Sequence, residues 1–318
     1  MKEVAIAIDL GATNLRVALI SKKGKIIQKI KIKTPKEGKS GKVITNKLIT
    51  LAQKIIQFAK QHNYKIPGIG ISSIGPLDYK KGEIVNSPNI PFKKVPIIQP
   101  LKRKFKLPVY LFNDCTSAVW GEKHFGKGKK FKNIIYITIS SGIGGGAIVD
   151  NHLLFGREGN AVEIGHFKID TKYNLLCGCK KGRGHWEGYC SGNNMPRFFK
   201  FWLKSQGLNF SNLNFSIKKI KTSKEIFELA RKREKIVLKF LKEVGKLNAA
   251  GINNVMVAYD PEIIILGGSI VLYNKEFILP YFKPYFEKYL PLPKIIITPL
   301  KEDVVLFGSA SLVFWPPD

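Results

Sequence analysis

The stretch VAIAIDLGATNLRVALISKKGKIIQKIKIK, residues 4–33, decides the fold class. Two short apolar runs, Val4–Asp9 and Leu15–Ile20, lie on either side of a glycine-containing turn. The turn-like sequence KKGK then precedes a segment in which isoleucines alternate with lysines. Alternation with a period of two is typical of a half-buried β-strand. We therefore expect three strands joined by tight turns, over Val4–Asp9, Leu15–Ile20 and Ile26–Lys33.

Beyond this stretch, helical and strand-like segments follow one another. Apolar residues recur every three or four positions from Ile44 to Ala59, which is typical of an amphipathic helix. The other expected strands are 68–74, 109–112, 134–139, 147–149, 263–266 and 295–298, and the other expected helices are 116–125, two within 223–258, 276–289 and 309–314. Residues 160–195 are expected to be irregular, with Trp186 as an anchor in the core or in a loop rather than a stacking platform for a sugar, and His124 is expected at the surface. Strands alternating with helices indicate an α/β class.

Length and composition limit what kind of protein this is. The chain has 318 residues, of which 44% are hydrophobic and 24% are charged, so it can bury a sizeable core, and two domains are expected. Its apolar runs are all shorter than the roughly 18 residues that span a bilayer. The N-terminal sequence also lacks the apolar region of a secretory signal. We therefore expect a cytoplasmic protein without a membrane partner.

The formal net charge of +30 first suggests nucleic-acid binding. However, only seven of the 53 basic residues are Arg, the residue that base readout and bidentate phosphate binding favour. The basic residues are also spread along the chain. A Lys-rich solvated surface is the preferred interpretation, with a polyanion-binding surface as the alternative, and we expect no nucleic-acid partner. The positive field would still attract an anionic substrate such as a nucleotide.

Three glycine-containing turns directly follow strand-like segments: DLGATNLR at 9–16, TISSGIGGG at 138–146 and GGS at 267–269. Glycine allows backbone amides to approach a phosphate closely. An acid at a strand end, such as Asp9, can hold a hydrated magnesium ion. One such turn is more often structural, but three together favour a nucleotide site. Neither a P-loop nor the dinucleotide-binding fingerprint is present.

Three of the four cysteines, Cys177, Cys179 and Cys190, lie within 14 positions of one another. A chain of this length with four cysteines is not a disulfide scaffold. The clustering therefore indicates a metal site more than a disulfide.

Taken in order along the chain, these segments resemble the ROK family of sugar kinases, within the actin-like ATPase superfamily. The matching segments are DLGATNLRVALI (9–20), GISSIGPLD (70–78), SPNIPF (87–92), NDCTSAVWGE (113–122), TISSGIGGGAI (138–148), NAVEIGHFKID (160–170), CGCKKGRGHWEGYCSG (177–192) and ILGGS (265–269). The resemblance implies a two-domain α/β fold of the actin-like ATPase (ribonuclease H-like) type with a cleft between the domains. The small domain would be 1–116, with a C-terminal helix at 302–318 packing back on it, and the large domain 117–301.

The resemblance also implies an ATP-dependent transfer of phosphate to the 6-hydroxyl of a hexose, for which glucose is the preferred candidate. Asp114 matches the catalytic base, which accepts the hydroxyl proton. Without the resemblance, an Asn-Asp pair after a strand would equally be a helix N-cap. The residues that match sugar ligands are Gly75, Asn89, Asn113, Asp114, Glu163, His166 and Glu187. The residues that match the ATP and Mg²⁺ site are Asp9, Gly11, Ala12, Thr13, Asn14, Ser141, Gly142, Gly144, Gly145, Gly267 and Gly268.

A structural zinc site is implied as well, and here the chain departs from the family pattern of one histidine followed by three cysteines. The expected ligands are His166, Cys177, Cys179 and His185, with His185 standing where the pattern has its third cysteine. Imidazole can replace thiolate at zinc. Cys190 is the alternative fourth ligand, and a reduced, metal-free loop is the alternative to a zinc site. Zinc on one nitrogen of His166 would leave the other facing a sugar hydroxyl.

Three other functions remain to be weighed. Some members of this family are sugar-responsive repressors with an N-terminal helix-turn-helix, for which the eight residues before Asp9 leave no room, so repression is not expected. A kinase for an N-acetylhexosamine (N-acetylmannosamine or N-acetylglucosamine) is the main alternative. A sugar-binding regulator without catalysis is disfavoured by the presence of Asp114. The family resemblance also implies a homodimer.

Overall fold

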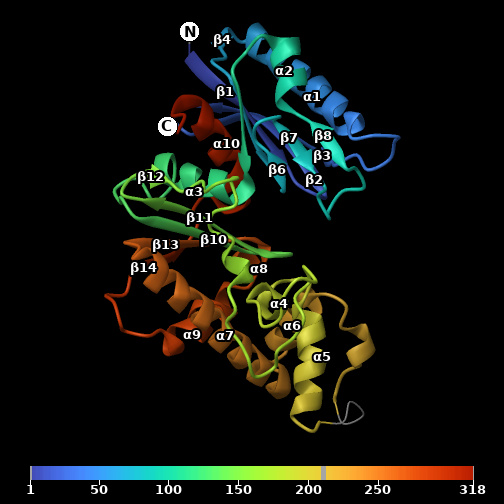
Figure 1. Ribbon diagram of the computed structural model, residues 1–318, viewed down its shortest axis with the longest axis vertical. Helices are drawn as coiled ribbons and strands as arrows, with labels where there is room; N and C mark the ends of the chain where they lie inside the picture. Colours follow the sequence, from blue (N-terminus) through green and yellow to red (C-terminus); the bar gives the residue numbers. More distant parts are fainter. Residues whose placement is uncertain (1, 209–212, 318) are drawn as a thin grey trace. The chain divides into compact units, whose positions relative to one another are not determined.

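The computed structural model describes residues 2–208 and 213–317; Met1, 209–212 and Asp318 lie outside the described residues. The chain forms two compact units (Figure 1). Unit 1 comprises Met1–Tyr136, Gly146–Ala161 and Thr298–Asp318, and unit 2 comprises Ile137–Gly145 and Val162–Ile297.

The elements of unit 1 follow the expected alternation of strands and helices. In chain order they are β1 (Lys2–Leu10), β2 (Asn14–Ser21), β3 (Ile26–Lys33), α1 (Lys42–Gln61), β4 (Tyr64–Lys65), β5 (Ile69–Ser73), β6 (Leu77–Asp78), β7 (Glu83–Val85), β8 (Lys94–Pro96), α2 (Ile98–Phe105), β9 (Val109–Asn113), α3 (Asp114–His124), β12 (His152–Leu153), the 3₁₀ turn η6 (Lys301–Asp303) and α10 (Val304–Phe314). The chain passes from unit 1 to unit 2 within β10 (Ile134–Ile139) and returns within β11 (Ile143–Val149).

The main sheet of unit 1 has the strand order β3-β2-β1-β5-β9, with β4 also paired to β1. β1, β2 and β3 form successive antiparallel pairs, so the three strands expected at the start of the chain are confirmed. β5 and β9 run parallel to β1. A separate small sheet has the order β6-β7-β8.

Side-chain alternation along β1 explains how both faces of this sheet are covered. Val4, Ile6 and Ile8 belong to a large core cluster that also contains the apolar face of α1, whereas Ala5 and Ala7 belong to a smaller cluster with α10. Successive side chains of a strand point to opposite faces, so the large and small residues are separated. The alanines leave room for α10 close to the sheet.

Helix α3, which carries Asp114 at its start, is held tightly against α10. A Cβ atom on Gly121 would lie 2.6 Å from the backbone nitrogen of Gly308, so the two helices meet almost backbone to backbone. His124 was expected at the surface, and this is wrong: its ring stacks on Trp315 with 4.5 Å between ring centroids, and burial lowers its pKa to about 4. The first break between the two units comes after Tyr136, and the domain boundary expected at residue 116 stays a prediction.

Unit 2 is rich in helices. Its elements are the 3₁₀ turn η1 (Ile164–His166), α4 (Glu187–Cys190), α5 (Met195–Ser205), η3 (Ile217–Lys219), α6 (Ser223–Arg231), α7 (Lys235–Tyr259), β13 (Ile263–Gly267), α8 (Ser269–Tyr273), η4 (Lys275–Phe277), α9 (Leu279–Phe282), η5 (Lys283–Tyr285) and β14 (Lys294–Ile297). The second sheet has the order β12-β11-β10-β13-β14. Trp186 is fully buried and donates its indole N–H to Asn248 on α7, as expected for a core anchor.

One expectation about unit 2 is wrong. The helix expected over 276–289 is broken into η4, α9 and η5, because Pro280 and Pro284 lack the backbone N–H that a continuous helix needs. Helix α5, which the sequence patterns did not predict, begins at Met195 and buries Phe198, Phe199 and Trp202.

The described helices are all too short or too polar to cross a lipid bilayer.

Candidate functional site

In unit 1, sequence-predicted residues gather where parallel strands end. β1, β5 and β9 lie side by side, with Asp9 opposite Ser72 and Ser73 opposite Asn113. Asp9 and Asn113 therefore stand near the carboxyl-terminal edge of one sheet, where open α/β sheets bind ligands. Asn89 is an exposed residue between β7 and β8.

Asp114 is the first residue of α3, and Asn113 caps that helix. The side-chain Oδ1 of Asn113 accepts the backbone N–H of Cys115 at 2.9 Å, and Oδ1 of Asp114 accepts the same N–H at 2.8 Å. The Asn-Asp pair therefore does form a helix N-cap, and a carboxylate is favoured there by the helix dipole. The Asn113 amide nitrogen faces Gly75, whose Cβ position would be 3.7 Å away.

Asp9 is held by a guanidinium group. Nε and Nη2 of Arg16 contact the same oxygen, Oδ2 of Asp9, at 2.6 and 2.5 Å. Nη1 of Arg16 also contacts Oδ1 of Asp303 at 3.2 Å, and Nζ of Lys29 contacts both carboxylate oxygens of Asp303. Burial raises the pKa of Asp9, and the adjacent Arg16 opposes that rise.

The turn that follows Asp9 is closed by its own backbone. The N–H of Gly11 binds the carbonyl oxygen of Asn14 at 3.0 Å, and the hydroxyl of Thr34 binds the carbonyl oxygen of Gly11 at 2.7 Å. The amide of Gly11 is therefore used inside the turn. Ala12 and Thr13 form the tip of this hairpin between β1 and β2.

The glycine-rich segment of unit 2 is mostly a strand. β11 begins at Ile143, so Gly144 and Gly145 belong to the strand, and the turn itself is limited to Ser140, Ser141 and Gly142. A Cβ on Gly145 would lie 2.8 Å from the side chain of Ile164. Position 145 needs glycine because the segment that contains Ile164 packs directly on β11.

Glu187 is fixed to this same turn. Its Oε2 accepts the backbone N–H of Ile143 at 2.9 Å. A Cβ on Gly142 would lie only 2.6 Å from that oxygen. Glycine at position 142 therefore makes room for the Glu187 carboxylate, a reason that the sequence alone did not reveal.

Glu163 and His166 lie in the same neighbourhood as Glu187. Burial raises the pKa of Glu163, the nearby His166 lowers it, and the nearby Glu187 raises it. The carbonyl of Ile143 also lies 2.2 Å from where a Cβ on Gly165 would be, so η1 rests on β11. Unit 2 thus brings together three of the sequence-predicted sugar ligands.

The third glycine pair lies beside the turn of residues 140–142. Gly268 has φ +88°, and its Cβ would be 2.4 Å from the carbonyl oxygen of Ile139, so both backbone conformation and space require glycine there. Ser269 contacts Ser140 through their hydroxyl oxygens at 3.0 Å. Gly267 ends β13 beside these residues.

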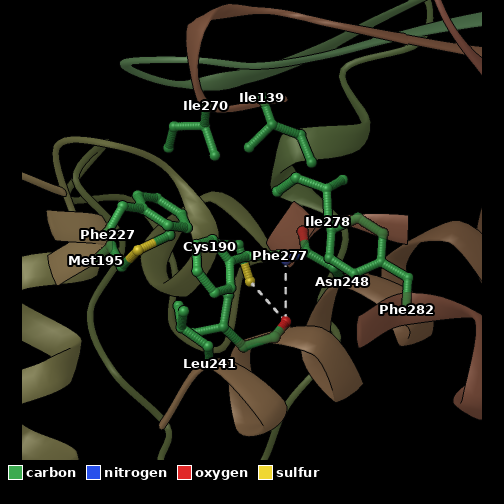
Figure 2. Close-up of a pocket in the computed structure, with 11 residues that line it drawn as sticks. Ile139, Cys190, Met195, Phe227, Leu241, Asn248, Ile270, Phe277, Ile278 and Phe282 are labelled. Atoms are coloured by element: carbon green, nitrogen blue, oxygen red, sulfur yellow. Dashed lines mark hydrogen bonds between the residues drawn. The ribbon is translucent and has the colours of Figure 1, made fainter. Parts of the chain in front are cut away.

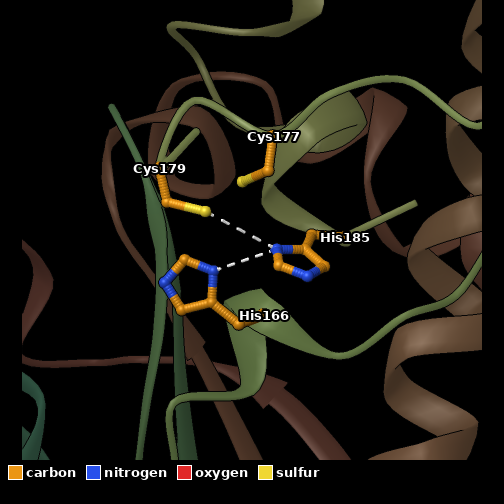
Figure 3. Close-up of side chains that lie close together, drawn as sticks. All are labelled: His166, Cys177, Cys179 and His185. Atoms are coloured by element: carbon orange, nitrogen blue, oxygen red, sulfur yellow. Dashed lines mark hydrogen bonds between the residues drawn. The ribbon is translucent and has the colours of Figure 1, made fainter. Parts of the chain in front are cut away.

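Four potential metal ligands converge in unit 2 (Figure 3). One ligand atom from each of His166, Cys177, Cys179 and His185 lies within 4.8 Å of all the others. Nδ1 of His185 is 3.3 Å from Nδ1 of His166 and 3.8 Å from the sulfur of Cys179. A tetrahedral zinc ion with bonds of about 2.0–2.3 Å fits between atoms at such separations. The donor set and geometry therefore fit zinc.

A tight hairpin builds this cluster. Leu176 is bridged to Arg183, and a Cβ on Gly182 would lie 2.2 Å from Nε2 of His185. Burial raises the pKa of Cys177 to about 11. Burial also lowers the pKa of His185, and the nearby His166 lowers it further. A bound cation would favour the thiolate that burial disfavours.

Cys190 lies outside this cluster of potential metal ligands. It is fully buried, and its thiol points to the carbonyl oxygen of Val244 at 3.8 Å. It lines a small apolar cavity of about 10 Å³, together with Met195 and Leu241 (Figure 2). Among the described residues, His185 and not Cys190 therefore completes the cluster with His166.

Comparisons with known proteins agree on one family. The model of the ROK family matches residues 5–314. The chain is 36% identical to a glucokinase from Pyrobaculum calidifontis, over 98% of this chain and 96% of that protein, and 34% identical to a glucokinase from Aeropyrum pernix, over 100% and 98%. It is also similar to the crystal structure of a ROK family glucokinase from Streptomyces griseus in complex with glucose and AMPPNP, with a TM-score of 0.75, 27% identity and coverage of 97% and 98% of the two chains.

The expected two-domain α/β architecture of ROK proteins is confirmed by this similarity. Since the family model covers nearly the whole sequence and two relatives exceed 30% identity at full length, this chain belongs to the ROK family.

Proposed function

We propose that this protein is an ATP-dependent glucokinase that phosphorylates the 6-hydroxyl of glucose. The observation that carries the proposal is the position of Asp114, at the end of β9 and the start of α3, in a chain that matches glucokinases over almost their full length. The crystallised relative that binds glucose and AMPPNP supports the same pair of substrates.

In this proposal Asp114 is the general base. Its carboxylate takes the proton of the sugar 6-hydroxyl as that oxygen bonds to the γ-phosphorus of ATP. The bond between the γ-phosphorus and its bridging oxygen breaks, and ADP leaves. Because phosphoryl transfer depends mainly on positioning and charge stabilisation, the rigid cap that fixes Asp114 matters as much as its basicity.

The proposed sugar ligands are Gly75, Asn89, Asn113, Glu163, His166 and Glu187. Two of these side chains already use one oxygen atom in a hydrogen bond to the backbone. Oδ1 of Asn113 accepts a backbone N–H, and so does Oε2 of Glu187, which leaves the Asn113 amide N–H groups and Oε1 of Glu187 for sugar hydroxyls. A fixed donor and a fixed acceptor reject sugars that lack the matching hydroxyl.

The glycine-containing turns are the proposed contacts of the nucleotide. In unit 1, Arg16 occupies Oδ2 of Asp9, so Oδ1 is the oxygen that would face the hydrated Mg²⁺ of ATP. Bound with ATP, that ion offsets charge on the phosphates. In unit 2, the turn of residues 140–142 and Gly268 would provide the remaining backbone surface for the nucleotide.

His166, Cys177, Cys179 and His185 would hold a structural zinc ion. When bound, zinc supplies a rigid link between η1 and the hairpin of residues 176–183. His166 would ligate it through Nδ1, the nitrogen that faces His185, and present Nε2 to the sugar. A homodimer is a further part of the proposal, and sedimentation of the purified protein tests it.

Gly142→Ala should impair the sugar site more than the nucleotide site. The new methyl group would overlap Oε2 of Glu187, the end of a flexible side chain, so the carboxylate moves away from the N–H of Ile143 while the fold is retained. Losing this charge-assisted hydrogen bond should raise KM for glucose about tenfold. Steady-state kinetics with each substrate varied in turn measure the effect.

Ser141→Ala is the matched variant one residue away. It adds no group near Glu187 but removes a hydroxyl from the proposed nucleotide turn, so KM for ATP should rise while KM for glucose stays constant. A Gly142→Ala variant that raises KM for ATP alone would show that Gly142 does not place Glu187 for the sugar.

The sugar is tested by a coupled assay of ADP release over a panel of hexoses and N-acetylhexosamines. We expect glucose to give the highest kcat/KM. If N-acetylmannosamine or N-acetylglucosamine gives the highest value, the protein is an N-acetylhexosamine kinase. If no sugar stimulates ADP release, catalysis itself is refuted.

A further inference from the structure

Tyr79 lies in the tight turn between β6 and β7, directly after the GISSIGPLD segment of residues 70–78. The side chain of Asp78 accepts the backbone N–H of Lys81 at 2.9 Å, and the carbonyl of Asp78 accepts the N–H of Gly82 at 2.7 Å. Gly82 has φ +66°, which suits this turn. The turn is thus well defined, and it holds Tyr79 in one place.

The hydroxyl of Tyr79 contacts the residue that precedes the proposed catalytic base. The backbone N–H of Asn113 donates to it at 3.2 Å. Asn113 is the last residue of β9 and the N-cap of α3, so its backbone sets both the direction of its own side chain and the position of Asp114. One hydrogen bond therefore joins the turn between β6 and β7 to the start of α3.

The ring of Tyr79 is fixed by two other aromatic side chains. Its centroid lies 6.2 Å from that of Phe112 and 4.5 Å from that of Phe155, and the Phe112 and Phe155 centroids are 5.4 Å apart, all with edge-to-face geometry. Gly159 lies against the same ring: it has φ +73°, and its Cβ would be 2.0 Å from Cε2 of Tyr79.

Through these contacts, Tyr79 joins its own turn to two other segments of unit 1. One is β9, which leads to Asn113, and the other is the segment around Phe155 and Gly159. The aromatic contacts fix the position of the ring. Because the Tyr79 hydroxyl accepts the N–H of Asn113, the fixed ring also restrains the backbone of Asn113.

We propose that Tyr79 is a positioning residue for phosphoryl transfer, one that sets the placement of Asn113 and Asp114 through the Asn113 backbone N–H. This inference rests on the proposed function, in which Asp114 is the base. Without the hydroxyl, the N–H of Asn113 loses this acceptor, and the start of α3 is free to shift. Small displacements of a base are sufficient to slow a reaction that depends on positioning.

Tyr79→Phe tests the inference because it removes the hydroxyl and keeps the ring. We expect kcat for glucose to fall about five- to tenfold, KM for ATP to stay unchanged, and the melting temperature to stay within about a degree of the wild type. Hydrogen exchange measured by mass spectrometry should become faster in the peptide that contains Asn113.

Tyr110→Phe is the matched control, since Tyr110 is a half-buried tyrosine on the same strand, packed against the core beside α10. It should leave kcat and exchange unchanged. The inference is refuted if Tyr79→Phe retains kcat within about twofold, or if its loss of kcat accompanies a lower melting temperature with unchanged exchange at Asn113. If the wild type and Tyr110→Phe do not phosphorylate glucose, the proposed function fails instead, while exchange still reports on the contact.

Discussion

Asp114→Asn is expected to lower kcat for glucose about a thousandfold while glucose binding is retained. Asparagine has nearly the same shape as aspartate, and its Oδ1 can still accept the backbone N–H of Cys115, which the native side chain does at 2.8 Å. It cannot take up the proton of the sugar hydroxyl. The start of α3 therefore remains in place, and only the chemistry is lost. The coupled ADP assay measures kcat, and intrinsic tryptophan fluorescence measures glucose binding.

The control is Asp260→Asn, at the left-handed residue that ends α7, where asparagine is readily accommodated. This variant should keep wild-type kcat. An Asp114→Asn variant that turns over glucose at more than about a tenth of the wild-type rate would show that another group is the base.

Removing the proposed zinc ion is expected to have the second-largest effect. The purified protein should contain about one zinc ion per chain, and Cys177→Ser should reduce this to a small fraction. The melting temperature should fall by several degrees, because the hairpin of residues 176–183 loses its link to η1. KM for glucose should rise about tenfold or more, since the ring of His166 is no longer held by the metal. Metal analysis, thermal unfolding and kinetics on the same preparation measure the three effects.

Cys190→Ala distinguishes the two candidate fourth ligands. Cys190 lines the apolar cavity in Figure 2 and bonds to Val244, so its replacement should leave the zinc content unchanged, whereas His185→Ala should lose the metal. Loss of zinc from Cys190→Ala, or full zinc content in both Cys177→Ser and His185→Ala, would contradict the assigned site.

The sequence predicted those parts of the fold that depend on local patterns. The apolar face predicted from the helical period from Ile44 to Ala59 is buried in one large core, and the isoleucines that alternate over Ile26–Lys33 pack against the same core, so both periods were informative. The helix expected at 276–289 is wrong because Pro280 and Pro284 break it into short pieces in the structure.

The chemical reason for individual glycines could not be predicted. The sequence shows a glycine at 142 but not which neighbour needs the space, and the structure identifies that neighbour as Glu187, which is distant in the chain. The same holds for Tyr79, whose hydroxyl contacts the backbone of Asn113, a residue 34 positions away on the strand paired with β5. Long-range contacts of this kind leave no periodic signal in a single sequence.

The most direct test of the central claim is identification of the products by ³¹P nuclear magnetic resonance after incubation with ATP, Mg²⁺ and glucose. The account predicts one glucose 6-phosphate for each ADP formed by the wild type, and none above background from Asp114→Asn. Phosphate on another hydroxyl of glucose, or ADP without any sugar phosphate, would contradict it.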